Sequence, residues 1–472
     1  MEVVLSHVCS EWRSTAINLT TLWTAFKFDT HLCVSDPFKK LEEYLSRSGT
    51  QLLELYFSFS LLDYNDSVLD ICNSFECDFV LVETAIAHAF RWSRFTLLAD
   101  EFIGAFEFID RFDNIYAPNL EYLALCLSSH TYPWSIAKIQ HRENIDTHPL
   151  ILTGGAPRLY AVRIDALTPF RSPSAFSNIT TLAIQGSPDD ELYFQLQDFH
   201  SILTIPTLTN LSIETWRCLD PYLTDNPEYL PSIKMPSLKT LRITQDSGIL
   251  SILSLIDAPL LETLILHNVD LISVYFYQDI HKIATFIRLD TIALLDCRYE
   301  LYDSEEDVDI VDMILHTIAC RATHVIISSP GGPSFIEEGS KLLDFNRYEW
   351  PRLQCLTLDL STFTFAGPMF SIGNFERSPH SLTVRVVKQV LDYWKGRGRQ
   401  CDGLMTLEKP RKLETMQVGD LMTDEPWPAP GGSFQEDGNL ENRFTWGETL
   451  RAKGSDWLWK SGVSQPFLLV WY

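Results

Sequence analysis

One phrase, repeated along the chain, constrains the fold more than any other feature of the sequence. A proline or small residue precedes the pattern Leu-x-x-Leu-x-Leu, and residues 118–125 give a clear copy. The last two apolar positions lie two residues apart, so both side chains point to one side of an extended chain. The preceding proline fixes the turn into that strand. Other clear copies lie at 157–164, 178–184, 206–213, 236–243, 259–266 and 351–358, and weaker ones at 52–57, 92–97, 289–294, 323–327 and 413–418. Each copy predicts one β-strand.

The spacing of the copies indicates an array of repeats. The first apolar position recurs at residues 120, 159, 179, 208, 238, 261 and 289, in steps of 20 to 39 residues. Leucine-rich repeats carry this pattern with a period of about 20–29 residues, so these units are longer and less regular. The sequence predicts an irregular leucine-rich repeat solenoid with inserted loops.

Helical patterns lie between the copies. Residues 36–49 begin with Asp36-Pro37, carry an apolar stripe and end near Gly49, which suits a helix terminus. Residues 79–90, 249–256 and 310–319 are similar. Strand, helix and strand in succession imply right-handed parallel crossovers, hence an α/β fold with strands on the concave face and helices on the convex face. The alternative is a doubly wound α/β domain, but its helices alternate between sheet faces, whereas one fixed phrase predicts that every unit docks alike.

The N-terminal segment carries a motif of its own. Leu5, Val8, Cys9, Trp12 and Ala16 form one apolar face of a predicted helix. Leu22-Trp23 follows ten residues after Trp12. The motif Leu-Ser-x-Val-Cys-x-x-Trp-Arg, with the later Leu-Trp, resembles the second half of an F-box from fungal F-box proteins with leucine-rich repeats. That family recruits substrates to cullin–RING ubiquitin ligases through a Skp-type adaptor. By this resemblance the adaptor-binding residues are Leu5, Val8, Cys9, Trp12, Leu22 and Trp23.

The resemblance implies three parts: a small all-α partial F-box at 1–30, a solenoid at 31–421 and a C-terminal tail at 422–472. The family's F-box opens with a Leu-Pro motif and a first helix, which this sequence does not contain, so we expect weak adaptor binding. The alternative is that residues 1–30 only cap the array, as terminal units of solenoids must. The protein would then be a leucine-rich repeat interaction protein unconnected to ubiquitin.

The C-terminal region changes in character. Residues 381–394 have the periodicity of an amphipathic helix, and its end carries Lys388, Lys395, Arg397 and Arg399. Cations there suit a helix C-terminus better than an anion site. Residues 424–432 are a loop rich in proline and glycine, and 466–472 are apolar enough to pack back on the last repeats.

Charge and cysteine usage exclude several classes of protein. The net charge is −25, which disfavours nucleic acid and anionic membranes as partners. No run of 18 apolar residues marks a transmembrane helix. The ten cysteines are dispersed without a leader sequence, so we expect reduced thiols and a cytoplasmic or nuclear location.

The sequence contains no motif of an enzyme or a metal site. Walker, dinucleotide-binding, nucleophile-elbow and zinc-protease patterns are all missing. Residues 328–333 imitate a phosphate loop, but their prolines lack N–H donors, so a plain turn is favoured. Residues 303–309 are acidic but lack the EF-hand glycine, which favours a solvated helix start. We predict no catalysis, no cofactor and no metal.

A binding surface remains. In a leucine-rich repeat solenoid, residues flanking the second apolar position line the concave sheet, where we expect a target protein to bind. The alternative is that most of these positions are merely solvated. Leu241 and Leu264 should be buried in adjacent strands, while Arg242 should face solvent. The predicted target-binding residues are Tyr122, Arg163, Asp165, Gln185, Asn210, Glu214, Thr240, Arg242, Thr244, His267, Thr357 and Asp359.

Overall fold

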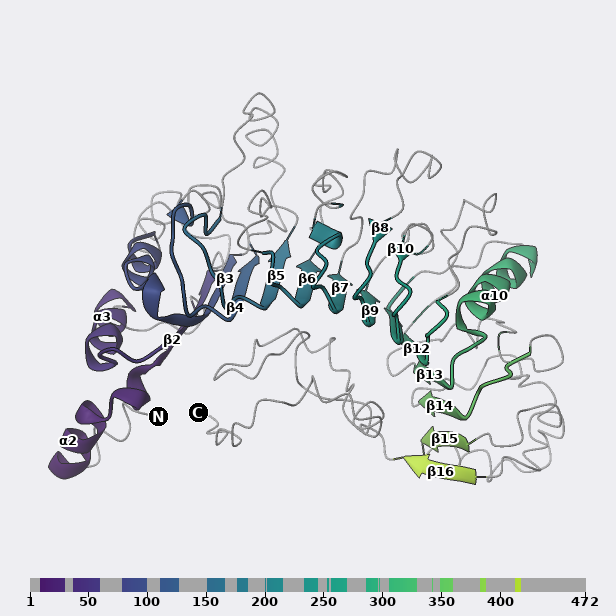
Figure 1. Ribbon diagram of the computed structural model, residues 1–472. Helices are drawn as coiled ribbons and strands as arrows, with labels where there is room; N and C mark the ends of the chain where they lie inside the picture. Colours follow the sequence, from purple (N-terminus) through teal and green to yellow (C-terminus); the bar gives the residue numbers. More distant parts are fainter. Residues whose placement is uncertain are drawn as a thin grey trace, which may run out of the picture. The chain divides into compact units, whose positions relative to one another are not determined.

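The computed structural model (Figure 1) describes a set of segments separated by gaps. They fall into two compact units, the first within Met1–Thr207 and the second within Leu208–Glu425. The described residues are 9–29, 37–59, 79–99, 111–126, 151–165, 176–185, 200, 202–214, 233–244, 253, 256–269, 286–295, 297, 305–328, 342, 349–359, 383–387 and 412–416.

The first unit begins with two short helices and continues as a parallel sheet whose strands follow chain order. Residues 79–86 are also helical. Its other elements are α2 (Ser10–Asn18), η1 (Thr20–Trp23), β1 (Ala25–Asp29), α3 (Pro37–Arg47), β2 (Leu53–Phe59), η3 (Ala89–Arg91), β3 (Trp92–Ala99), β4 (Tyr122–Cys126), β5 (Ala161–Asp165) and β6 (Thr181–Gln185).

The second unit repeats the arrangement: its main strands are parallel and again follow chain order, while β8 and β10 pair separately. Its elements are β7 (Asn210–Glu214), β8 (Ile233–Lys234), β9 (Thr240–Thr244), β10 (Ile256–Asp257), β11 (Thr263–His267), β12 (Thr291–Leu295), α10 (Glu305–Ala319), β13 (His324–Ser328), β14 (Cys355–Asp359), β15 (Thr383–Val387) and β16 (Lys412–Met416). The fold is therefore mixed α/β with parallel sheet, as predicted, and each copy of the phrase coincides with a strand.

A recurrent turn explains the proline of the phrase. The N–H of Leu120 donates to the carbonyl of Ala117 over 3.2 Å, and Leu261 donates to Ala258 over 3.1 Å. The proline occupies the second position of these four-residue turns, where its fixed φ suits a type I or type II turn. The residue that opens the turn is buried, with Ala117 at 0% exposure and Ala258 at 2%. The phrase therefore encodes an anchored turn followed by a strand.

Each sheet has one face of apolar side chains, which we call the apolar face. Leu241 and Leu264 are register partners on β9 and β11, and both are 0% exposed, which confirms the prediction for this pair. Burial of one such side chain contributes about 1.5–3 kcal/mol. The apolar face comprises Phe26, Leu55, Phe95, Leu123, Val162, Leu182, Phe28, Phe57, Leu97, Leu125, Ile164 and Ile184 in the first unit, and Leu211, Leu241, Leu264, Ile292, Val325, Leu356, Ile213, Ile243, Leu266, Leu294 and Ile327 in the second.

Helix α3 packs on the apolar face of the first unit. The Tyr44 ring lies 5.4 Å from the ring of Phe26, centroid to centroid. Gly49 follows the helix with φ 59°, so it supplies the left-handed residue expected after a helix C-terminus. Buried Arg91, from the next repeat, donates to the carbonyls of Leu45 and Gln51. Arg91 therefore holds the end of α3 against the strand that follows.

Two predicted boundaries differ from the structure. The helix predicted over 381–394 is wrong at its start, because Thr383–Val387 forms strand β15. The β-branched side chains of Thr-Val-Arg-Val-Val favour a strand, and pairing with β14 outweighs the helical periodicity. Strand β1 also lies inside the predicted F-box region 1–30, so the sheet begins earlier than expected. The helix predicted over 310–319 is confirmed as part of α10.

Candidate binding surfaces

The face of each sheet opposite the apolar face carries polar and apolar side chains together, and we call it the mixed face. Its side chains alternate with those of the apolar face along every strand. The mixed face comprises Ala25, Lys27, Glu54, Tyr56, Arg94, Thr96, Tyr122, Ala124, Ala161, Arg163, Thr181 and Ala183 in the first unit, and Asn210, Ser212, Thr240, Arg242, Thr244, Thr263, Ile265, His267, Thr291, Ala293, Leu295, His324, Ile326, Cys355 and Thr357 in the second.

Many predicted target-binding residues are buried, although they lie on the mixed face. The prediction that Arg242 faces solvent is wrong, because it is 6% exposed. Strand β9 reads as buried at every position, so both of its faces are excluded from water, as is common in parallel sheets. Arg163 is half-buried, and the side chains of Asp165, Gln185, Glu214 and Asp359 lie outside the description. The other buried members are Tyr122, Asn210, Thr240, Thr244, His267 and Thr357.

Burial perturbs two titratable groups of the mixed face. Burial first, and repulsion from Arg242 second, lower the pKa of His267 to about 3. Burial raises the pKa of Tyr122 to about 12, although Arg163 and Arg94 act in the opposite direction. Both side chains are therefore neutral at physiological pH.

A regular backbone ladder aligns the residues that precede the strands of the second unit. The Glu262 carbonyl accepts from the N–H groups of Asp290 and Thr291 over 2.8 and 3.0 Å. The Asp290 carbonyl accepts likewise from Thr323 and His324 over 2.8 and 2.9 Å. Side chains from successive repeats therefore meet at this edge, where Asp290 meets Thr323.

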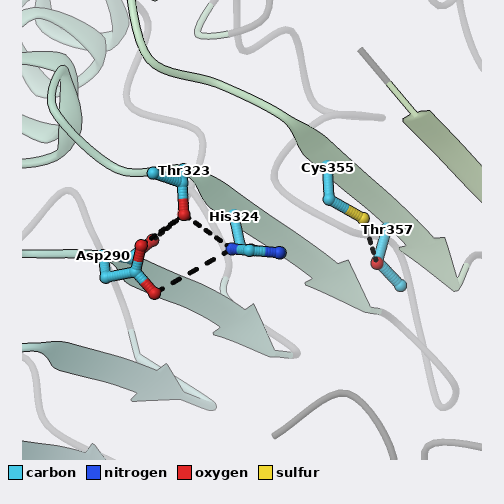
Figure 2. Close-up of polar contacts among 5 residues, drawn as sticks. All are labelled: Asp290, Thr323, His324, Cys355 and Thr357. Carbon is cyan, nitrogen blue, oxygen red and sulfur yellow. Dashed lines mark hydrogen bonds and ion pairs between the residues drawn. The ribbon is translucent and has the colours of Figure 1, made fainter. Parts of the chain in front are cut away.

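Asp290, Thr323 and His324 form a polar cluster at this edge (Figure 2). The Thr323 hydroxyl donates to the Asp290 carboxylate, and His324 Nδ1 lies 2.7 Å from the same hydroxyl oxygen. The other Asp290 oxygen, Oδ2, lies 4.0 Å from His324 Nδ1. The Thr323 hydroxyl has one proton, so an N–H on His324 Nδ1 is the donor that fits a hydroxyl already donating to Asp290.

The neighbouring strand places a thiol beside this histidine. Cys355 is the register partner of His324, and its Sγ lies 3.9 Å from Thr357 Oγ1 (Figure 2). Within the described residues, no group of three His, Cys, Asp or Glu side chains is placed to hold a metal ion. The cluster therefore fixes the position of the His324 imidazole beside Cys355.

The structure separates the predicted adaptor-binding residues. Trp23 is 2% exposed, donates from Nε1 to the Ala16 carbonyl over 2.7 Å, and packs on Tyr44 and Arg47. Its assignment to an adaptor surface is wrong, because it belongs to the core of the first unit. Trp12 is 52% exposed on α2.

The other four predicted adaptor-binding residues form no exposed apolar surface that the structure describes. Cys9 is exposed, and its Sγ accepts from the Trp12 N–H over 3.4 Å as the helix N-cap. Leu22 is half-buried. Leu5 and Val8 lie outside the described residues.

Sequence reasoning missed three residues of the mixed face in the first unit. Lys27, Tyr56 and Arg94 lie on β1, β2 and β3, beside the predicted Tyr122 and Arg163. The period-two alternation in Ala25-Phe-Lys-Phe-Asp29 could have marked β1 as a strand with Lys27 on this face.

The chain matches no protein-family model and no curated protein sequence. In the described part of the chain, no helix is long and apolar enough to cross a membrane. A function must therefore be argued from the surfaces above.

Proposed function

We propose that this protein is the substrate-recognition subunit of a cullin–RING (SCF-type) ubiquitin ligase, built as a leucine-rich repeat solenoid. The mixed face of the strands receives a target protein, and α2 receives a Skp-type adaptor. The observation that carries the proposal is the unequal burial of the two tryptophans of the N-terminal motif. Trp23 is 2% exposed, whereas Trp12 is 52% exposed.

The apolar surface on α2 favours a partner. Ile17 and Leu19 are also exposed, at 37% and 46%, at the C-terminal end of the same helix. Removing apolar surface from water contributes about 25 cal/mol per Å², and tryptophan is among the residues most enriched at the centres of interfaces. An adaptor that covers Trp12 would gain this free energy.

The repeats support the other half of the proposal. Strands follow chain order in each unit, and one phrase with one turn supplies them. Solenoids of this kind present extended surfaces suited to protein partners. The His324 ring, which the Thr323 hydroxyl holds in position, is one group that a target could recognise.

The test is adaptor capture by a tryptophan variant. We expect Trp12→Ala to weaken binding of a purified Skp-type adaptor at least about tenfold, because truncating a central interface tryptophan costs about 2 kcal/mol or more. Biolayer interferometry measures the affinity. The matched control is Phe90→Ala, which removes an aromatic side chain of the same unit that is 56% exposed and should leave adaptor binding unchanged.

A second candidate is an interaction protein unconnected to ubiquitin, and the packing of Trp23 favours it. Trp23 lies 5.2 Å from the Tyr44 ring, and its ring lies 4.2 Å from the Arg47 guanidinium carbon, and these contacts support a capping role for this segment. Absence of adaptor binding by the unmodified protein, at concentrations well above those of known complexes, would favour this second candidate.

A further inference from the structure

A thiol and an imidazole lie side by side on the mixed face of the second unit. Cys355 on β14 is the register partner of His324 on β13. Neighbouring strands are about 4.8 Å apart and register partners point to the same face, so the two side chains are neighbours. Cys355 is a reduced thiol that is 6% exposed, and the side chain of His324 is 24% exposed. The thiol is therefore open only to a small reactant.

Two further residues fix the orientation of the imidazole. The Thr323 hydroxyl donates to the Asp290 carboxylate, and His324 Nδ1 lies 2.7 Å from the hydroxyl oxygen. A neutral imidazole that donates from Nδ1 carries its lone pair on Nε2, and Figure 2 shows the second ring nitrogen on the side of the ring toward Cys355. The ring can therefore accept the proton of the thiol. The Asp290 carboxylate, with Oδ2 4.0 Å from Nδ1, would stabilise the imidazolium.

A hydroxyl lies on the other side of the proton transfer, beside the sulfur. Cys355 Sγ lies 3.9 Å from Thr357 Oγ1, two residues further along the same strand, and either atom can donate. A hydroxyl that donates to sulfur favours the thiolate, as does an imidazolium nearby. The thiolate is the nucleophilic form of cysteine. The cluster therefore holds a stabilising group for each product of the proton transfer.

A second cysteine gives the matched comparison within the same chain. Cys126 ends β4, two residues beyond Ala124 of the mixed face, and it is also 6% exposed. Its register partner on β3 is Leu98, where Cys355 has a histidine. The two thiols are equally buried and differ in the side chain that faces them across the strand pair.

We propose that Cys355 is a site of oxidation by hydrogen peroxide, with His324 as the proton acceptor and Asp290 and Thr323 as positioning residues. The thiol proton passes to Nε2, the thiolate attacks one peroxide oxygen, an S–O bond forms and the O–O bond breaks. The departing hydroxide takes the proton from the imidazolium. The products are a sulfenic acid and water, with sulfur oxidised and peroxide reduced. The inference does not depend on the proposed function.

The size and charge of the reactant fit the site. Hydrogen peroxide is small enough for a thiol that is 6% exposed. It is also neutral, so the net charge of −25 does not repel it. A larger oxidant such as a dipeptide-sized disulfide would have to displace the side chains around the sulfur.

The experiment follows the loss of each thiol when the whole chain is treated with hydrogen peroxide. The reaction is stopped with catalase, the protein is unfolded in iodoacetamide, and peptide mass spectrometry measures the unblocked fraction of each cysteine. We expect Cys355 to be oxidised about tenfold faster than Cys126, because the thiolate is the reacting form. His324→Gln should lower the rate at Cys355 to that at Cys126 and leave Cys126 unchanged.

Two threonine variants test the positioning. Thr323→Ser keeps the hydroxyl and should keep the rate, whereas Thr323→Val should lower the rate about fivefold, as the loss of one hydrogen bond would. A variant that merely loosened the fold would expose Cys355 and speed its oxidation, so a slower rate reports the chemistry. Equal rates at Cys355 and Cys126 would overturn the inference. So would a Cys355 rate that His324→Gln leaves unchanged or raises.

Discussion

At the scale of single residues, the direction of a side chain and its access to water are different properties. The alternation in Leu241-Arg-Ile243 places Arg242 opposite two buried aliphatic side chains, and the structure agrees. Yet Arg242 is 6% exposed and His267 is 3% exposed. The local pattern gives only the direction, because coverage depends on packing across the whole sheet.

The burial of His267 makes stability depend on pH. Its pKa is about 3 when folded and about 6.5 when unfolded, so below pH 6.5 only the unfolded state binds this proton. Stability should fall as the pH drops from 6.5 towards 3, by about 1.4 kcal/mol per pH unit. His267→Gln should remove this part of the slope. Urea unfolding of both proteins at several pH values tests it, and parallel slopes would contradict it.

At the scale of elements, the phrase predicted strands wherever its turn was present. It missed β1 and β15, and the two-residue strands β8 and β10. For β15, helical and strand periodicities overlap over a short apolar run, and only pairing with β14 and β16 decides between them.

The apolar face gives the element-scale prediction. Leu241→Ala should lower the free energy of unfolding by about 2–5 kcal/mol, because it leaves a cavity among fully buried neighbours. Lys239→Ala, two residues earlier and 54% exposed in a long ion pair with Glu262, should cost under about 0.5 kcal/mol. Denaturant titration compares them. Similar losses for the two variants would refute the assignment of faces.

At the scale of the whole chain, the candidate sites were only partly predictable. The resemblance of the N-terminal motif predicted that both tryptophans bind an adaptor. It does not predict that Trp23 packs against Tyr44 of α3, because strand β1 lies between these two residues in the sequence. Lys27, Tyr56, Arg94, Tyr122 and Arg163 lie on five successive strands of the mixed face of the first unit. No local motif groups these residues, because they become neighbours only through the pairing of the strands.

The net charge should make the stability of the protein depend on salt. At −25, the folded chain repels itself, and surface ion pairs such as Arg111 with Glu83, at 3.1 Å, offset little of this repulsion. Raising NaCl from about 0.1 M to 1 M shortens the Debye length from about 10 to 3 Å. The melting temperature should therefore rise by a few degrees. Differential scanning fluorimetry over a salt series measures this change. A melting temperature that falls with salt would mean that attractive ion pairs outweigh the net repulsion.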